Sequence, residues 1–162
     1  MKKLLLLLTL LLLTLGLTAC DWADSTPEEM HGFLDDVAGF FGRSQITDDD
    51  ELIGTRKLSD DAYTGTYTSD CAGNTGRDVI FGGGSILNKT LSIKGQISTE
   101  SGSAHVRIRM NDEVVELESD SDGRFDTELS IHSGGNYIMI DYSDFAGSVE
   151  LLCKYDASTE HE

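Results

Sequence analysis

Hydrophobic and polar residues alternate along most of the second half of the chain. The apolar members of successive alternating segments are Leu91, Ile93 and Ile97; Val106, Ile108 and Met110; Val115 and Leu117; Phe125, Thr127, Leu129 and Ile131; Ile138, Ile140 and Tyr142; and Val149, Leu151, Cys153 and Tyr155. A period of two places successive side chains on opposite faces of a β-strand. Repeated over several short segments, it predicts a mainly β fold over residues 63–156, an antiparallel β-sandwich.

Polar turn residues separate these segments. Turns are expected at Asn111-Asp112, at Ser121-Asp122-Gly123 and, in a looser form, at Ser133-Gly134-Gly135-Asn136. Across the first turn, the outward Arg107 and Arg109 are expected to face Glu116 and Glu118, which would help to fix the register.

The period is helical nearer the N-terminus. The apolar residues at helical spacing are Met30, Phe33, Leu34, Val37, Phe40 and Phe41. Ser25 or Thr26 can cap the helix, and Pro27 occupies a first position where a missing N–H costs nothing. Residues 27–42 are therefore expected to form one amphipathic helix that packs against the sandwich, with an interfacial or partner-binding helix as the alternative.

Between this helix and the sandwich, residues 43–62 are polar and acidic. They are interpreted as an acidic linker in which Leu52 and Ile53 dock on the following domain. The run Asp48-Asp49-Asp50-Glu51 lacks the alternating oxygens and the glycine of a calcium loop, so a solvated acidic run is expected. At the other end, residues 157–162 are expected to form a disordered tail.

The first residues have the pattern of an export signal. Lys2 and Lys3 precede an apolar run from Leu4 to Leu17, which is shorter than the roughly 20 residues of a spanning helix. The run ends in Leu17-Thr18-Ala19-Cys20, which resembles the lipobox of bacterial lipoproteins.

The lipobox resemblance implies that residues 1–19 are removed by cleavage between Ala19 and Cys20, and that the Cys20 thiol carries a diacylglyceryl group. Residues 20–26 would then form a lipidated tether, because two acyl chains give stable attachment. The expected location is the cell membrane, with the domain on the extracytoplasmic side. Asp21 resembles the inner-membrane retention signal of Gram-negative lipoproteins, but the sequence does not identify the type of envelope.

The net charge of the chain limits the classes of molecule that it can bind. The chain has 12 basic and 29 acidic residues, a formal charge of −17, and the exported part loses Lys2 and Lys3. Such a surface repels nucleic-acid phosphates and anionic lipid headgroups. Nucleic acid is therefore excluded as a partner, whereas cationic ligands, metal ions and neutral sugars stay open.

The stretch from Gly102 to Tyr155 carries a second resemblance. The turn Asp120-Ser121-Asp122-Gly123-Arg124-Phe125 and the later Gly135-Asn136-Tyr137 resemble motifs of immunoglobulin-like and carboxypeptidase-regulatory-like sandwiches. This resemblance implies an immunoglobulin-like fold and no particular ligand. The same aspartates begin a calcium-loop pattern, but the position of its bidentate Glu is occupied by Ile131, so a turn is expected.

Cys71 and Cys153 are left after Cys20 is assigned to lipid. In an oxidising compartment a disulfide between them would close a loop of about 80 residues and contribute roughly 4 kcal/mol. Two separate thiols, with Cys153 facing the core, are the alternative.

Motifs of catalysis are absent from the sequence: there is no G-x-S-x-G, H-E-x-x-H, C-x-x-C or phosphate-binding loop. The glycine-rich Phe81–Ser85 segment is expected to form a bulge or a strand end. His105 and His132 are a candidate zinc pair without a third ligand, so no metal or cofactor is expected.

The function expected from these features is that of a membrane-anchored surface lipoprotein with a non-catalytic binding module of unidentified ligand. An enzyme or accessory subunit acting on envelope glycan or peptidoglycan is the alternative. Candidate binding residues are exposed aromatics on loops or strand ends, with half-buried core residues as the competing interpretation. They are Tyr63, Tyr67, Tyr137 and Phe145. A glycan or protein of the envelope is the expected partner, and the oligomeric state is left open.

Replacement of Cys20 by serine is expected to release the protein from membranes. Serine cannot form the thioether, so the anchor is lost while the exported domain is unchanged. Fractionation after a high-salt wash, with intact mass measurement of the native product, checks this. A Cys20→Ser protein that still sediments with membranes, or a native product without acyl mass, would contradict it.

Overall fold

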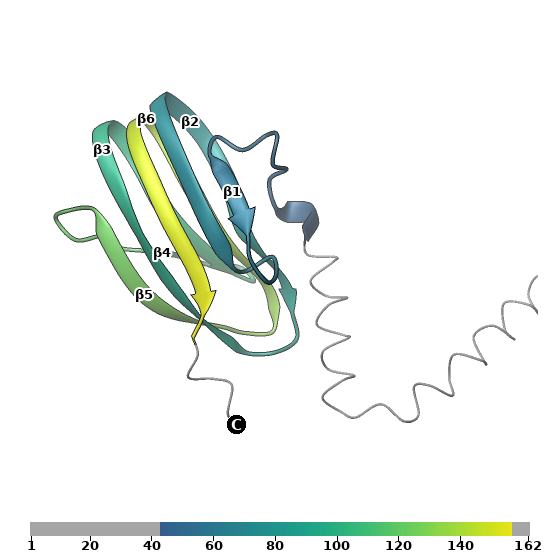
Figure 1. Ribbon diagram of the computed structural model, residues 1–162. Coiled ribbons are helices and arrows are strands. Elements are labelled where there is room, and N and C mark those ends of the chain that lie inside the picture. The colour runs from purple at the N-terminus through teal and green to yellow at the C-terminus, as the bar shows by residue number, and fades with distance from the viewer. Residues whose placement is uncertain (1–42, 157–162) are drawn as a thin grey trace, which may run out of the picture. The chain divides into compact units, whose positions relative to one another are not determined.

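The computed structural model describes residues 43–156 (Figure 1). In chain order the elements are the 3-10 turn η1 (Arg43–Gln45) and the strands β1 (Thr55–Leu58), β2 (Gly65–Ser85), β3 (Lys89–Met110), β4 (Glu113–Glu116), β5 (Arg124–Ile131) and β6 (Gly134–Tyr155). The expected signal with its Ala19–Cys20 cleavage site, the tether, the helix 27–42 and the tail 157–162 lie outside the described residues. Within residues 43–156, no helix has the length and apolar character needed to cross a bilayer.

All the strands pair antiparallel, in the order β1-β2-β6-β3-β4, with β5 added to β3. The expected mainly β, antiparallel fold is confirmed. Strands β2, β3 and β6 have 21, 22 and 22 residues, about twice the upper end of the usual strand length. Each one bends once and contributes to two layers, and Figure 1 shows the three strands bending together at one end of the molecule.

The first layer contains β1, the first part of β2, the last part of β6, the first part of β3, and β5. The second layer contains the remaining parts of β2, β6 and β3, with β4 at its edge. The bends fall where the ladders shift register, between Ala72 and Gly76 in β2 and between Thr99 and Ser103 in β3. The fold is thus a six-stranded sheet folded over into two layers.

The bends contain backbone conformations and close approaches that most side chains would not allow. Gly102 has a φ of +68°, and a Cβ atom there would lie 2.1 Å from the carbonyl oxygen of Asp144. Asp144 itself has a φ of 45° and is held in place because its N–H donates to Thr75 Oγ1 at 2.8 Å. Glycine, aspartate and a local hydroxyl together let β3 and β6 turn at the same level.

The inward side chains of the two layers meet in one core. The alternation expected from the sequence is confirmed for most strands, and the least exposed apolar residues include Ile80, Phe81, Leu91, Ile93, Val106, Ile108, Ile140, Phe145, Val149 and Cys153. The exception is β4, an edge strand with strand β3 on one side only. Val115, expected to face inward, is 37% exposed, because an edge strand of four residues lies beside the core and not within it.

Polar side chains also link the layers inside the core, in what we call the interlayer network: Tyr67, Ser69, Asp78 and Tyr142. The hydroxyl of Tyr67 donates to the Asp78 carboxylate and lies 2.9 Å from the hydroxyl of Tyr142, which lies 3.0 Å from Ser69 Oγ. Burial raises the pKa of Tyr142 to about 12. Burial, reinforced by the bond to Asp78, also raises the pKa of Tyr67 far above its usual value. Both tyrosines are therefore neutral donors at physiological pH.

The Asp78 carboxylate is 1% exposed and accepts further bonds from the chain before β1. The N–H of Ile53 donates to both carboxylate oxygens at 3.1 and 3.0 Å, and the N–H of Gly54 donates to Oδ2 at 3.2 Å. A buried charge is tolerated when several donors replace its lost hydration, and here two amides and one hydroxyl do so.

Residues 43–62 are more than the linker that their composition indicates. They include β1, and both Leu52 and Ile53 pack against the core, as the docking hypothesis expected. Thr47 exchanges two hydrogen bonds with the backbone of Val79, and Arg56 donates to the carbonyl oxygen of Ile80 at 3.0 Å. Because β1 lies in this segment, the sheet begins before the expected boundary at Tyr63. The bonds of Thr47 and Arg56 also cover the free edge of β2 in the second layer.

The hairpin at Asn111-Asp112 is confirmed, and Asn111 adopts a φ of 57° as such turns require. Arg107 lies opposite Glu116 and donates to it at 3.0 Å, as expected. The expected pairing of Arg109 with Glu118 is wrong. Strand β4 ends at Glu116, and Arg109 lies opposite Val114 with its guanidinium 4.5 Å from the centre of the Tyr137 ring.

The two other turn segments differ in outcome. Asp120 Oδ1 accepts the N–H groups of Asp122 at 2.9 Å and Arg124 at 2.8 Å, so this aspartate closes a turn, as expected. The looser turn expected at residues 133–136 is shorter than predicted, because β6 already begins at Gly134.

The glycines 82–84 lie at the end of β2, where a Cβ atom on Gly82 would lie 2.1 Å from the carbonyl oxygen of Asn136. The expected strand end is therefore confirmed.

Replacing Asp78 by alanine is expected to lower the free energy of unfolding by about 3–5 kcal/mol, since buried N–H and O–H donors lose their acceptor. Asp126→Ala is the matched control, because Asp126 forms a surface ion pair with Lys94 and should cost less than about 1 kcal/mol. Urea denaturation of both variants checks this. Equal midpoints for the two would contradict the importance of the interlayer network.

Candidate functional site

The aromatic residues singled out as binding candidates are not exposed. Tyr63, Tyr67, Tyr137 and Phe145 are 4%, 0%, 3% and 0% exposed. Their function is packing, and that of Tyr67 includes the interlayer network. The hypothesis of aromatic binding residues is therefore wrong. The long strands fold over, and this places positions that resemble strand ends in the sequence inside the core.

Cys71 and Cys153 are two separate buried thiols, which agrees with the second of the two interpretations of the sequence and not with the disulfide. Along the β2–β6 ladder Cys153 lies opposite Gly65, whereas Cys71 lies opposite Gly147. Six residues of strand separate the two positions, about 20 Å, which is far beyond the roughly 7 Å that a disulfide can bridge. Burial raises the pKa of the Cys153 thiol to about 12.

The two candidate zinc histidines are not brought together. His105 lies in the second layer opposite Asp141, with Nδ1 2.7 Å from Glu116 Oε1. His132 follows β5, whose last residue pairs with Lys89 at the other end of β3. In the part of the chain that the structure describes, no group of three potential metal-binding side chains occurs.

A broad hollow of the described surface lies on the outer side of the first layer, next to the bends. Its volume is about 1100 Å³. It is lined by Ile53, Gly54, Thr55, Thr68, Ser69, Asp70, Cys71, Ala72, Ser98, Thr99, Glu100, Ala146, Gly147, Ser148, Val149 and Glu150. These residues come from β1 and the loop before it, β2, β3 and β6, and we call this feature the hollow.

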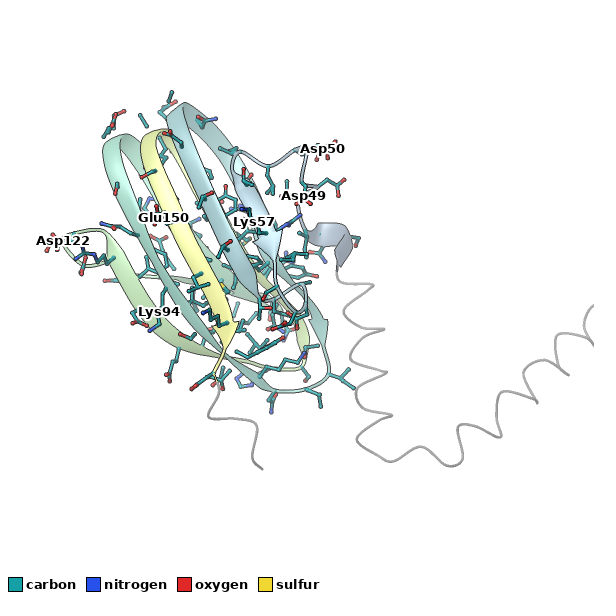
Figure 2. All side chains as sticks on the ribbon, in the orientation of Figure 1. Asp49, Asp50, Lys57, Lys94, Asp122 and Glu150 are labelled. Atoms are coloured by element: carbon teal, nitrogen blue, oxygen red, sulfur yellow. The ribbon has the colours of Figure 1, made fainter. Side chains whose placement is uncertain are left out.

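Two cross-strand rows of outward side chains form the surface of the hollow. One row joins Thr55, Thr68 and Glu150, and the next joins Asp70, Ser148 and Ser98. Figure 2 shows Glu150 on β6 in the middle of the first layer. The residues are small or hydroxyl-bearing apart from the carboxylates, so the sheet is left open at this level.

The interlayer network supports the hollow from behind. Ile53 and Gly54 form one wall, and their amides are the ones held by Asp78. Ser69, which also lines the hollow, is held by Tyr142. On the floor, a Cβ atom on Gly147 would lie 2.0 Å from the carbonyl oxygen of Ser98, so β6 and β3 approach closely only because this residue is glycine. These contacts connect the lining of the hollow with the buried network.

The charges in the hollow all have one sign. Asp70, Glu100 and Glu150 line it, and no lysine, arginine or histidine does. Within the described residues, these three carboxylates have no hydrogen-bond or ion-pair partner. Chemically, the surface offers carboxylates for cations and hydroxyl groups that both donate and accept hydrogen bonds.

The outer side of the second layer differs because its charges satisfy one another. Asp141 binds Arg77 and Arg107, each with a distance of 2.8 Å, and Glu116 binds Arg107 and His105. Hydrogen bonds from Arg77 and from Arg107 hold the pKa values of Asp141 and Glu116, respectively, below their usual values. Because these charges are paired with one another, the hollow is the better candidate site. Sequence patterning did not reveal the hollow, because its residues are scattered over four segments.

The sequence matches no family model and no curated protein. Among solved structures, the chain is similar to the pre-peptidase C-terminal domain of collagenase from Bacillus anthracis, with 14% identity and a TM-score of 0.44 over 57% of this chain and 90% of that one. A carbohydrate binding module from Cellvibrio mixtus lichenase 5A has 6% identity and a TM-score of 0.34 over 70% and 94%. The Podospora anserina GH26-CBM35 β-(1,4)-mannanase has 18% identity and a TM-score of 0.31 over 64% and 25%. At these scores the likeness assigns no function to the chain.

In the Cys20→Ser protein, both remaining thiols are expected to stay reduced and to react slowly. For Cys153, burial moves the pKa from 9.0 to about 12, so the thiolate fraction at neutral pH falls about a thousandfold. Iodoacetamide labelling followed by mass spectrometry should modify the urea-unfolded protein much faster than the folded one. Equal labelling rates, or a mass that rises by two hydrogens on reduction, would contradict this.

Proposed function

We propose that this chain is a lipid-anchored bacterial envelope protein and that its β-sandwich is a non-catalytic module that binds an envelope partner in the hollow. The observation that carries the binding function is the hollow itself. It has a volume of about 1100 Å³, and the backbone of one wall is bonded to a buried carboxylate.

Size and rigidity support a binding function. Ligand sites commonly enclose about 300–1,000 Å³ and are largely formed before the ligand arrives. A wall held by Asp78 loses little conformational entropy on binding, so more of the interaction energy appears as affinity.

The anchor is supported by the N-terminal sequence. The Lys2-Lys3 pair, the leucine-rich run and Leu17-Thr18-Ala19-Cys20 occur in the order and spacing of a lipoprotein signal. The exported part keeps all 29 acidic residues and loses Lys2 and Lys3, so the domain would be repelled by anionic headgroups and would stand away from the bilayer on its tether.

The composition of the hollow favours binding over catalysis. Its ionisable residues are three carboxylates and the thiol of Cys71, which is 5% exposed. No histidine or lysine lies there to act as a base toward a hydroxyl or thiol nucleophile. The alternative, a hydrolase of envelope glycan, would use two of the carboxylates as acid and base or nucleophile.

Filling the hollow is expected to abolish ligand binding. Ser148 lines the hollow between Asp70 of β2 and Ser98 of β3, so Ser148→Tyr is expected to block it, and Ser130→Tyr on the exposed side of β5 is the matched control outside the hollow. Both variants and the parent are heated with a panel of envelope glycans and peptides, because a ligand raises the melting temperature according to its concentration and affinity. A ligand should shift the parent and the control but not Ser148→Tyr.

Two outcomes would contradict the proposed function. A ligand that shifts all three proteins equally would place binding elsewhere, and a panel without any shift would remove the binding function. In parallel, new reducing ends released from envelope glycan by the parent but not by Glu150→Gln would establish the hydrolase instead.

A further inference from the structure

We propose that the occupant of the hollow is a basic, extended segment of a partner protein, held by its lysine or arginine side chains. This inference rests on the proposed function and names the chemistry of its ligand.

Unpaired charge of one sign is the first argument. Asp70, Glu100 and Glu150 come from three different strands and line one concavity without a basic residue among them. Some other carboxylates of the described surface are neutralised locally, for example Asp126 by Lys94 at 2.9 Å and Asp141 by two arginines, whereas those of the hollow have no basic neighbour in its lining. The carboxylates of the hollow thus have capacity left for external cations, and complementary charge sets orientation and association rate.

The lysines closest along the strands do not remove this capacity. Lys57 on β1 and Lys94 on β3 lie one outward row farther from the bends than Thr55 and Gln96, and neither lines the hollow. Figure 2 shows Lys94 farther from the bends than Glu150. The two lysines bound the acidic area on one side and therefore limit where a basic ligand can lie.

Dimensions fit a short stretch of extended chain. The hollow crosses β1, β2, β6 and β3, which at about 4.8 Å between neighbouring strands is roughly 14 Å. About four residues of extended peptide cover that distance at roughly 3.3 Å per residue. Hydroxyl groups of Thr55, Thr68 and Ser98 lie between the carboxylates and can bond to peptide N–H and C=O groups.

The absence of aromatic side chains favours a peptide over a sugar polymer. No tyrosine, tryptophan or phenylalanine lines the hollow, so a pyranose ring would find no flat apolar face to stack on. Flexible lysine or arginine side chains need only carboxylates and hydroxyls. The overall charge of −17 would also steer a basic segment toward the protein from a distance.

The test compares two charge-matched triple variants of the full-length, detergent-solubilised protein. Asp70→Asn/Glu100→Gln/Glu150→Gln removes the carboxylates of the hollow. Asp112→Asn/Glu113→Gln/Glu118→Gln removes the same charge from exposed positions at the β3–β4 hairpin. The probe is a fluorescent peptide of alternating lysine and serine, followed by anisotropy at low and at physiological ionic strength.

The hollow variant is expected to raise the Kd for this peptide about tenfold, as three surface ion pairs would, while the hairpin variant changes it less than about twofold. Higher salt should weaken binding to the parent and reduce the difference. Thermal unfolding of each variant shows whether it is folded. Equal weakening by both variants would mean non-specific attraction and would overturn the proposal, and so would equal binding of a serine-only peptide.

A second arm separates this inference from the proposed function. Amine-bearing glucosamine oligosaccharides are titrated in the same assay, and tighter binding of these in the hollow would replace the peptide by a sugar ligand. If the peptide fails but Ser148→Tyr still abolishes binding of a panel ligand, only the basic-peptide inference falls. If Ser148→Tyr changes nothing with any ligand, the proposed function falls as well.

Discussion

The buried carboxylate of Asp78 is the group on which most of the structure depends. It lies just after the bend of β2 and binds Tyr67, which precedes the same bend, so one hydrogen bond closes the fold of the strand on itself. Tyr67 continues the network to Tyr142 of β6 and from there to Ser69. Two backbone amides before β1 complete the set of donors. A charge placed in the core needs all of these partners, and that need ties the layers, the N-terminal arm and the bend to one geometry.

This arrangement also connects the core with the surface. The amides that Asp78 holds belong to Ile53 and Gly54, which form a wall of the hollow, and Ser69 contributes to its floor. The same strands that bury the network inside therefore present the candidate site outside. The bends matter for both faces: they leave small residues and close backbone approaches such as Gly147 at the level of the hollow. Stability and the shape of the candidate site consequently have a common origin.

The outer faces of the two layers differ in whether their charged side chains are paired. On the second layer, arginines alternate with carboxylates across four strands, and the charges compensate one another. On the first layer, the carboxylates of the hollow lack such partners among the described residues. A lipid anchor at the N-terminus, as proposed, would hold this acidic domain near a surface while its charge keeps it from lying down on anionic headgroups. The open carboxylates would then face solvent and potential partners.

The sequence by itself determined the mainly β fold, most of the core positions and the hairpin at Asn111-Asp112, because a period of two and turn chemistry are local properties. Tertiary structure decided what local patterns do not contain. The alternation of residues does not say that three strands of more than twenty residues bend over. The sequence therefore left open whether Tyr63, Tyr67, Tyr137 and Phe145 are binding or core residues, and whether Cys71 and Cys153 are bridged; the tertiary structure buries all four and leaves the two thiols separate. The composition of the acidic segment 43–62 predicts a linker, and it does not show the bonds of Thr47 and Arg56 to the edge of β2. The hollow, finally, combines residues more than ninety positions apart, and only the register of β1, β2, β6 and β3 brings them onto one face.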